Sequence, residues 1–308
     1  MFLHNDRKLF QSVIQEITDD TGVDAALIEK DYYVTLVLKR LVEKEPLLIF
    51  KGGTCLSKCY KLIERFSEDI DINLENVNSQ TQSRKKQMKD HIDDTVREFG
   101  FELLNPQDIA SGRSHNGYKI GYPTLYQGIA FPNMVLVKTM FLVDTFPTQR
   151  MEAGSLVYDH LVQSGDYAAI AEYGLIPFEV TVQSLERTFV DKVFALGTHY
   201  INDRMYWQSR HLYDLYKILP HIKLNKDMEN LFDEVRVAWK SRKGNQNWTA
   251  AEDVANFPKL LKEIITTEAY RSDYENVTTK LLYEQVPYED TIRSLKKIVS
   301  EMEGGSAM

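Results

Sequence analysis

Apolar residues first recur at helical spacing within residues 7–41. The recurrence is interrupted at Thr21-Gly22, so two helices are expected rather than one. Apolar positions three or four residues apart form a single face, which a helix can bury. The first helix would bury Leu9, Phe10, Val13, Ile14 and Ile17, and the second Leu27, Ile28, Tyr32, Leu36, Val37 and Leu41.

The pattern changes at residues 47–50, Leu-Leu-Ile-Phe, a run long enough for a buried strand. Lys51-Gly52-Gly53 ends the run, because glycines let the backbone turn sharply and bring its N–H groups close to a ligand. Thr54 is then placed as the N-cap of a following helix. Free N–H groups at such a helix start favour phosphate. The apolar stripe of this helix would hold Cys55, Leu56, Cys59, Leu62 and Ile63.

Residues 65–72 alternate in the manner of a strand. Phe66, Ile70 and Ile72 share one parity, and the other parity holds Ser67, Asp69 and Asp71. Two carboxylates on one face repel each other unless a cation or a proton lies between them. Mg²⁺ suits this place, since it is usually held by one or two carboxylates together with substrate phosphates. Phosphoryl and nucleotidyl transfer need this combination of a phosphate-binding turn and a metal site.

The rest of the chain predicts an α+β protein, with a mixed sheet and flanking helices followed by a helical domain. We place the boundary loosely, giving domains 1–178 and 179–308, the second completing the active-site cleft. Strands are expected at residues 101–104, 118–126, 134–146 and 178–182, the last at the sheet edge, and helices at 84–99, 154–173, 184–196, 209–217, 228–240, 250–267, 273–282 and 291–302. Residues 304–308 are expected to be disordered.

Composition narrows the class of protein. The 308 residues are 43% hydrophobic, which is ordinary for a soluble globular protein, and no apolar run approaches the roughly 20 residues that span a bilayer. A cytoplasmic protein without a membrane segment is expected. Cys55 and Cys59 are interpreted as small buried apolar residues. The net charge of -8 argues against strong electrostatic binding of nucleic acid by the whole protein. The basic residues at 84–86 or 240–243 could still form a local binding patch, or they could simply be solvent-exposed.

The motif Lys51-Gly52-Gly53-Thr54-x-Leu56-Ser57, with residues 65–71, resembles the nucleotidyltransferase superfamily and more narrowly the AbiEii/AbiGii toxin family. Residues 185–192 and 210–216 are similar to two further motifs of that family. The resemblance implies a Mg²⁺-dependent transfer of a nucleoside monophosphate from an NTP to a hydroxyl, with tRNA as acceptor in some members. It also implies a toxin of a toxin–antitoxin or phage-defence pair, with an antitoxin partner.

The same resemblance assigns roles to individual residues. Asp69 and Asp71 would hold Mg²⁺, Lys192 and Arg187 would neutralise the phosphates, and Asp214 would orient an acceptor or act as a base. Lys30 and Asp31 could also reach the site. His211 shares a helix face with Asp214, and we interpret these two residues as a buried hydrogen-bonded pair. The triphosphate would be held by Gly52, Gly53, Thr54 and Ser67.

One departure from the family pattern concerns a third carboxylate on the strand beside Asp-x-Asp. The family register places Lys138, or less well Met140, where an acid is expected. Asp144 has the same parity but lies roughly 20 Å further along an extended strand, so it could substitute only if the strand bends. Two alternatives therefore stay open: an NTP-binding protein that acts through a partner with little or no transferase activity, and an enzyme that phosphorylates or nucleotidylates a protein.

Overall fold

The computed structural model describes residues 1–110, 114–126, 132–240 and 257–305. Its contacts divide the chain into two compact units, each described here by itself. Unit 1 comprises Met1–Lys61 and Ser67–Val182. Unit 2 comprises Leu62–Phe66 and Gln183–Met308, so a five-residue segment before Ser67 belongs to unit 2.

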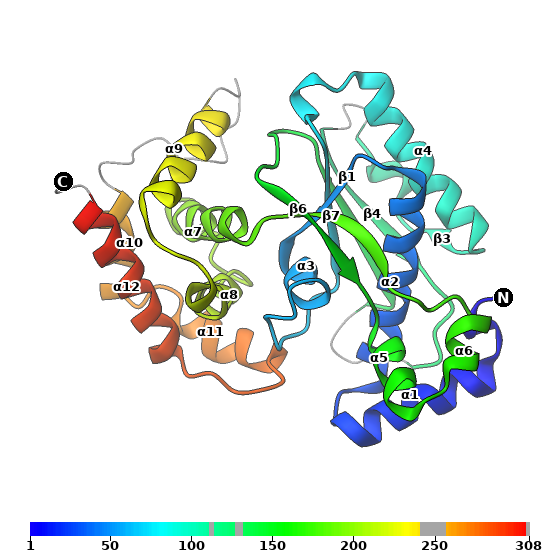
Figure 1. Ribbon diagram of the computed structural model, residues 1–308. Helices are drawn as coiled ribbons and strands as arrows, with labels where there is room; N and C mark the ends of the chain where they lie inside the picture. The colour runs from blue at the N-terminus through cyan, green and yellow to red at the C-terminus, as the bar shows by residue number, and fades with distance from the viewer. Residues whose placement is uncertain (111–113, 127–131, 241–256, 306–308) are drawn as a thin grey trace. The chain divides into compact units, whose positions relative to one another are not determined.

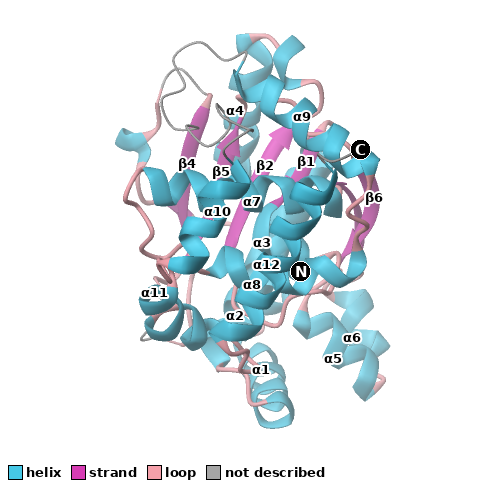
Figure 2. Ribbon diagram, turned by 90° about the vertical axis from the view of Figure 1, so that its left-hand side faces the viewer, coloured by secondary structure: helices cyan, strands magenta, loops and turns pink. Residues whose placement is uncertain are grey.

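Within the described residues, unit 1 is built on a seven-stranded mixed sheet of order β3-β4-β5-β2-β1-β7-β6 (Figures 1 and 2). The central strand β2 is antiparallel to β1 and parallel to β5, and β1 is parallel to β7. The expected α+β class is confirmed. The strands are β1 (Leu48–Lys51), β2 (Asp69–Leu74), β3 (Glu102–Leu103), β4 (His115–Gly121), β5 (Met134–Met140), β6 (Thr148–Ala153) and β7 (Phe178–Gln183).

The two faces of this sheet differ in chemistry. Ile70 and Ile72 on β2, with Val135 and Val137 on β5, are fully buried in one apolar core. Helices α2 (Ala25–Lys44) and α4 (Gln82–Glu98) pack together and contact strands of the sheet. Alternation along the strands places Asp69 and Asp71 on the opposite face. The other helices of unit 1 are α1 (Arg7–Thr21), α3 (Gly52–Lys58), α5 (Leu156–Ser164) and α6 (Tyr167–Glu172).

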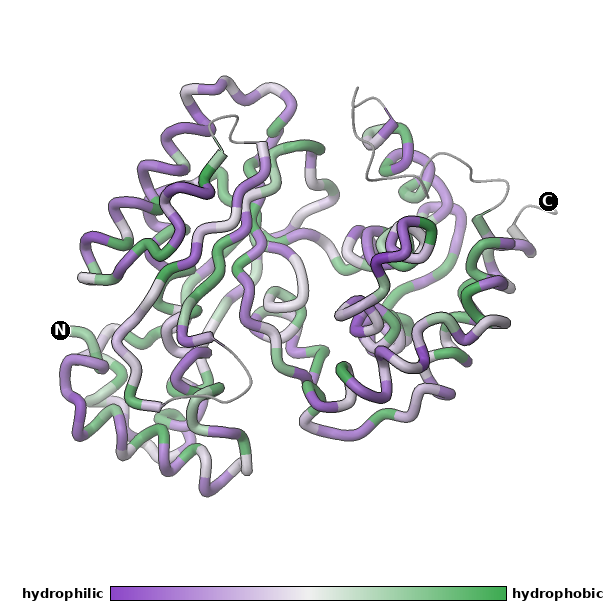
Figure 3. Tube along the Cα trace, turned by 180° about the vertical axis from the view of Figure 1, so that it is seen from behind, coloured by the Kyte–Doolittle hydropathy of each residue, from purple (hydrophilic) through white to green (hydrophobic). Residues whose placement is uncertain are grey.

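Beyond Gln183, the described part of unit 2 consists of helices and the loops that connect them. Its interior includes packed aromatic rings, with Phe194 contacting both Phe232 and Phe257. Hydrophilic and hydrophobic positions alternate along its helices (Figure 3). The helices are α7 (Leu185–Ile201), α8 (Arg210–Ile218), α9 (Lys226–Lys240), α10 (Phe257–Thr266), α11 (Arg271–Asn276) and α12 (Tyr288–Gly305).

Several predicted boundaries were wrong. The helix after the glycine turn begins at Gly52 with Lys51 as its N-cap, so Thr54 lies inside the first turn, and the helix ends at Lys58. Strand β5 ends at Met140 rather than continuing to residue 146. Strand β7 is not at the sheet edge, because β6, which the sequence did not predict, lies outside it. Helix α12 continues to Gly305, and the remaining tail lies outside the described residues.

The sequence also led to expectations about the two cysteines, the two basic segments and membrane-spanning helices. Cys55 and Cys59 are buried, as expected, and neither forms a disulfide. Arg84 forms an ion pair with Glu45, and the buried Lys85 ammonium donates to the Phe141 carbonyl at 3.2 Å, so these two cations have structural partners. The alternative patch at residues 240–243 lies almost wholly outside the described residues. None of the helices that the structure describes is both long and apolar enough to cross a membrane.

Candidate active site

The glycine turn between β1 and α3 carries a carboxylate directly against its backbone. Gly52 has φ +81°, in the left-handed region that favours glycine. A Cβ built on Gly52 would lie 3.0 Å from Cγ of Asp71, and closer still to one carboxylate oxygen. Lys51 pairs with Asp71 across the antiparallel β1–β2 ladder, which fixes this approach. Only glycine therefore fits both the backbone angle and the space beside Asp71.

Two hydroxyl groups complete this corner of unit 1. The Thr54 Oγ1 and Ser67 Oγ atoms are 3.0 Å apart, which is hydrogen-bonding distance. Ser67 precedes β2 rather than lying in it, so the parity argument held for Asp69 and Asp71 but not for Ser67. The structure nevertheless brings Thr54 and Ser67 together beside the glycine turn.

Ammonium groups flank the acidic strand. Lys138 on β5 is in register with Asp71 and forms an ion pair with Asp69. Lys30 is buried, forms an ion pair with Glu68, and donates to the Pro132 carbonyl at 2.9 Å. Burial lowers the pKa of Lys30 to about 8, and the negative charge of Asp69 opposes that effect. Two ammonium groups of the protein thus pair with Glu68 and Asp69.

Asp31 has a different position from its neighbour Lys30. Its carboxylate accepts from the buried Lys58 ammonium at 2.5 Å and from the Leu156 backbone N–H at 2.8 Å. Lys58 also donates to the Thr35 hydroxyl at 2.6 Å. Asp31 therefore holds α2, α3 and the start of α5 together, while Lys30 is the member of the pair that reaches the acidic strand.

Among the residues that the structure describes, no third acid joins Asp69 and Asp71 in a metal-binding cluster. Within the residues that the structure describes, no three His, Cys, Asp or Glu side chains cluster closely enough to hold a metal ion. Asp144 lies beyond the end of β5 and accepts from the backbone and side chain of Asn78, at 2.9 and 2.7 Å. Two carboxylates still fit a Mg²⁺ ion that shares its remaining ligands with substrate phosphates.

A second cluster of charge lies inside unit 2. Asp214 accepts two hydrogen bonds from Arg65, at 2.7 and 2.8 Å, and one from Lys192 at 2.5 Å, and all three residues are buried. Burial alone would raise the pKa of Asp214, but the charges of Arg65 and Lys192 outweigh it and hold that pKa well below its usual range. Sequence reasoning singled out Lys192 and Asp214 but gave no role to Arg65.

The remaining residues predicted on these helices have local partners. Arg187 is buried and donates to Asp191 at 3.0 Å. The expected hydrogen bond between His211 and Asp214 is not formed. Instead His211 stacks on His199 with ring centroids 6.0 Å apart, and its Nδ1 has no hydrogen-bond partner among the described residues. Burial holds the pKa of His211 well below its usual value.

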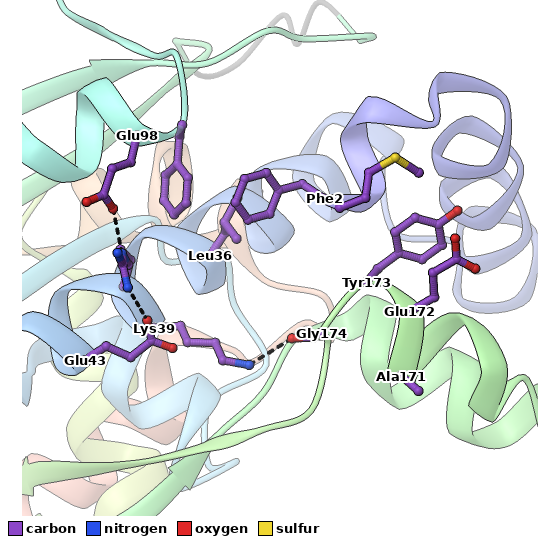
Figure 4. A pocket seen from close by; sticks show the side chains of 12 residues that line it. Phe2, Leu36, Lys39, Glu43, Glu98, Ala171, Glu172, Tyr173 and Gly174 are labelled. Carbon is purple, nitrogen blue, oxygen red and sulfur yellow. Dashed lines mark hydrogen bonds and ion pairs between the residues drawn. The ribbon is translucent and has the colours of Figure 1, made fainter.

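A pocket of about 570 Å³ lies elsewhere in unit 1 (Figure 4). Several of its polar groups pair with one another: Arg40 bonds to Glu98 at 2.6 Å, and Lys39 donates to the Gly174 carbonyl at 2.8 Å. Apolar side chains such as Phe2 and Leu36 form part of its lining. None of the residues discussed above for the acidic strand or the glycine turn lines it, so size alone does not identify the reactive site.

The glycine turn leads to a first test. Gly52→Ala is expected to destabilise the protein by clearly more than Gly22→Ala, measured by chemical denaturation. Both glycines have positive φ, but an added Cβ at Gly22 meets no atom within 4 Å, so only the backbone cost of about 1–2 kcal/mol applies there. The clash with Asp71 adds to that cost at Gly52. Equal losses in the two variants would contradict the packing of Asp71 against the turn.

A glycine turn after a buried strand, followed by a short helix and an Asp-x-Asp strand in a mixed sheet, defines a nucleotidyltransferase architecture. The family model described as "Nucleotidyl transferase AbiEii toxin, Type IV TA system" matches residues 36–298. The chain therefore belongs to the AbiEii family of nucleotidyltransferase toxins.

A solved structure has the same fold. It is MenT4, a nucleotidyltransferase toxin from Mycobacterium tuberculosis H37Rv, with a TM-score of 0.57 and 14% sequence identity. The match covers 94% of this chain and 89% of that one. At this identity the likeness is one of fold. A comparison with curated protein sequences gave no match.

Proposed function

We propose that this nucleotidyltransferase toxin moves a nucleoside monophosphate from an NTP to a hydroxyl of tRNA in a Mg²⁺-dependent reaction. The observation that carries the proposal is the pair Asp69 and Asp71 on one face of β2, with Asp71 packed against the turn at Gly52. A cognate antitoxin and a role in phage defence belong to the same proposal, and both rest on the family.

The proposed roles in unit 1 follow from the donor types present. Asp69 and Asp71 would hold Mg²⁺, which when bound neutralises the phosphates and orients them for displacement. The Thr54 and Ser67 hydroxyls are close enough to act together on one phosphate. Gly52 and Gly53 would let phosphate oxygens approach the backbone N–H groups, because no side chain intervenes.

In unit 2, Lys192 and Arg187 are proposed to neutralise charge on the phosphates, as the family resemblance implies. The alternative of Asp214 as a general base is disfavoured, because its lowered pKa makes the carboxylate a weak proton acceptor near neutral pH. Its bonds to Arg65 and Lys192 support a positioning role instead. We therefore propose that Asp214 holds the Lys192 ammonium in place.

Incubation with each α-³²P-labelled NTP and Mg²⁺, with tRNA or cell protein as acceptor, tests this function. Label on tRNA is the expected result. Label on protein would replace the RNA acceptor by a protein one. Nucleotide binding without any transfer would instead indicate an NTP-binding protein that acts through a partner. That alternative arises because Lys138 occupies the position of the expected third carboxylate.

A further inference from the structure

Lys138 occupies the strand position where a third carboxylate was expected. The parallel β2–β5 register pairs Lys138 directly with Asp71, and its ammonium forms an ion pair with Asp69 one step along the same face. The Asp69 side chain is 17% exposed and that of Lys138 is 35% exposed, so the pair is only partly screened by solvent. Lys138 therefore contacts the carboxylate pair itself rather than a distant surface.

Two of the three carboxylates around the acidic strand are paired with ammonium groups without a metal ion. Glu68, Asp69 and Asp71 supply three carboxylates. Lys30 forms an ion pair with Glu68 and Lys138 with Asp69. Lys51 faces Asp71 in the strand register, and its ammonium donates to the Met140 sulfur at 3.7 Å. Adjacent carboxylates repel each other, and the positive charge of an ammonium beside them reduces that repulsion. A nucleotide-free centre thus has little electrostatic demand for a divalent ion.

We propose, on the basis of the proposed transfer function, that the Lys138 ammonium takes the place of a metal ion beside Asp69 in the nucleotide-free protein. A divalent ion then enters this centre only together with a nucleoside triphosphate. A triphosphate brings both additional negative charge and the oxygen ligands that two carboxylates alone do not supply. The long, flexible stem of Lys138 lets its ammonium move from Asp69 to a phosphate oxygen when these arrive.

Mn²⁺ binding, followed by electron paramagnetic resonance, tests this directly. The wild-type protein is expected to bind Mn²⁺ weakly alone and about tenfold or more tightly with the α,β-methylene analogue of its NTP. Lys138→Glu adds the third carboxylate and should tighten nucleotide-free binding by about tenfold or more. Lys138→Met, which removes the charge alone, should fall between the two.

Lys86→Glu is the matched control, because it makes the same charge change at an exposed position of α4. It should leave Mn²⁺ binding unchanged. Thermal unfolding keeps the test informative if Lys138→Glu is less stable, since that variant should gain the most stability on addition of Mn²⁺.

The Mn²⁺-binding results distinguish a failure of the proposed role of Lys138 from a failure of the proposed nucleotidyl transfer. Tight Mn²⁺ binding by nucleotide-free wild-type protein, unchanged in Lys138→Glu and Lys138→Met, would overturn the role of Lys138 and leave nucleotidyl transfer intact. If Mn²⁺ fails to bind the wild-type protein even with any of the four NTP analogues, the proposed function and the inference both fail.

Discussion

Asp71→Asn is expected to lower nucleotidyl transfer by about a thousandfold or more while leaving the fold intact. The amide keeps the size of the carboxylate, so the packing against Gly52 is preserved. It loses the negative charge that would bind Mg²⁺ and, through it, the triphosphate. Losing one fixed electrostatic contact to the transition state costs about 10²–10³ in rate, and losing a metal ligand costs at least as much.

Asp144→Asn is the control for this experiment. It makes the same chemical change on the segment that follows β5, at the residue that could have served as the third acid. Because Asp144 accepts hydrogen bonds from Asn78 instead, its variant should retain transfer within a few-fold. Transfer is measured as label on tRNA, and folding by circular dichroism. A normal rate in Asp71→Asn, or equal losses in both variants, would refute the assignment of Asp71.

Local patterns made part of this site predictable from sequence. The two-residue period of a strand placed Asp69 and Asp71 on one face, and the glycine pair marked the turn beside them. The sequence placed Lys138 on the strand beside Asp-x-Asp, and the structure pairs it in register with Asp71. What the sequence did not reveal was the partner that Lys138 would take, since ion pairs depend on side-chain geometry rather than on spacing.

Long-range contacts account for the other omissions. Arg65 and Asp214 are 149 positions apart, and no local pattern links them. Strand β6 reads Thr-Gln-Arg-Met-Glu-Ala and is mostly exposed at the sheet edge, so it lacks the apolar alternation that identifies a strand. Without β6, β7 was expected at the edge. The division into domains 1–178 and 179–308 stays a prediction, and a linear boundary of that kind has no place for a segment such as Leu62–Phe66, whose contacts lie in unit 2.

The second large effect is expected on stability. Asp214→Asn should destabilise unit 2 by about 3–5 kcal/mol, because it leaves the buried cations Arg65 and Lys192 without their counter-charge. All three tryptophans of the chain follow residue 183, so tryptophan fluorescence during denaturation reports on this unit. Asp233→Asn, which affects only an exposed ion pair with Arg236, should change stability by less than about 1 kcal/mol.

The pH dependence gives an independent reading of the same cluster. The pKa of Asp214 is lower in the folded than in the unfolded protein, so the unfolded chain binds more protons in acid. The stabilisation that Asp214 gives the folded protein is therefore complete above its unfolded-state pKa of about 3.9 and is lost as the pH falls below that value. Asp214→Asn should lack this part of the acid-induced loss. An unchanged acid profile in the variant would contradict the charged state of Asp214.

A triple replacement separates stability from function in this cluster. Substituting Arg65→Met, Lys192→Met and Asp214→Leu removes all three buried charges at once and leaves apolar side chains of similar length. Buried ion pairs replaced by well-packed apolar groups are often neutral or stabilising, so much of the stability lost in Asp214→Asn should return. Transfer should be absent in the triple variant, because no ammonium remains at position 192 to neutralise the phosphates. If the triple variant recovers both stability and transfer, the cluster serves folding alone, and Lys192 has no part in the reaction.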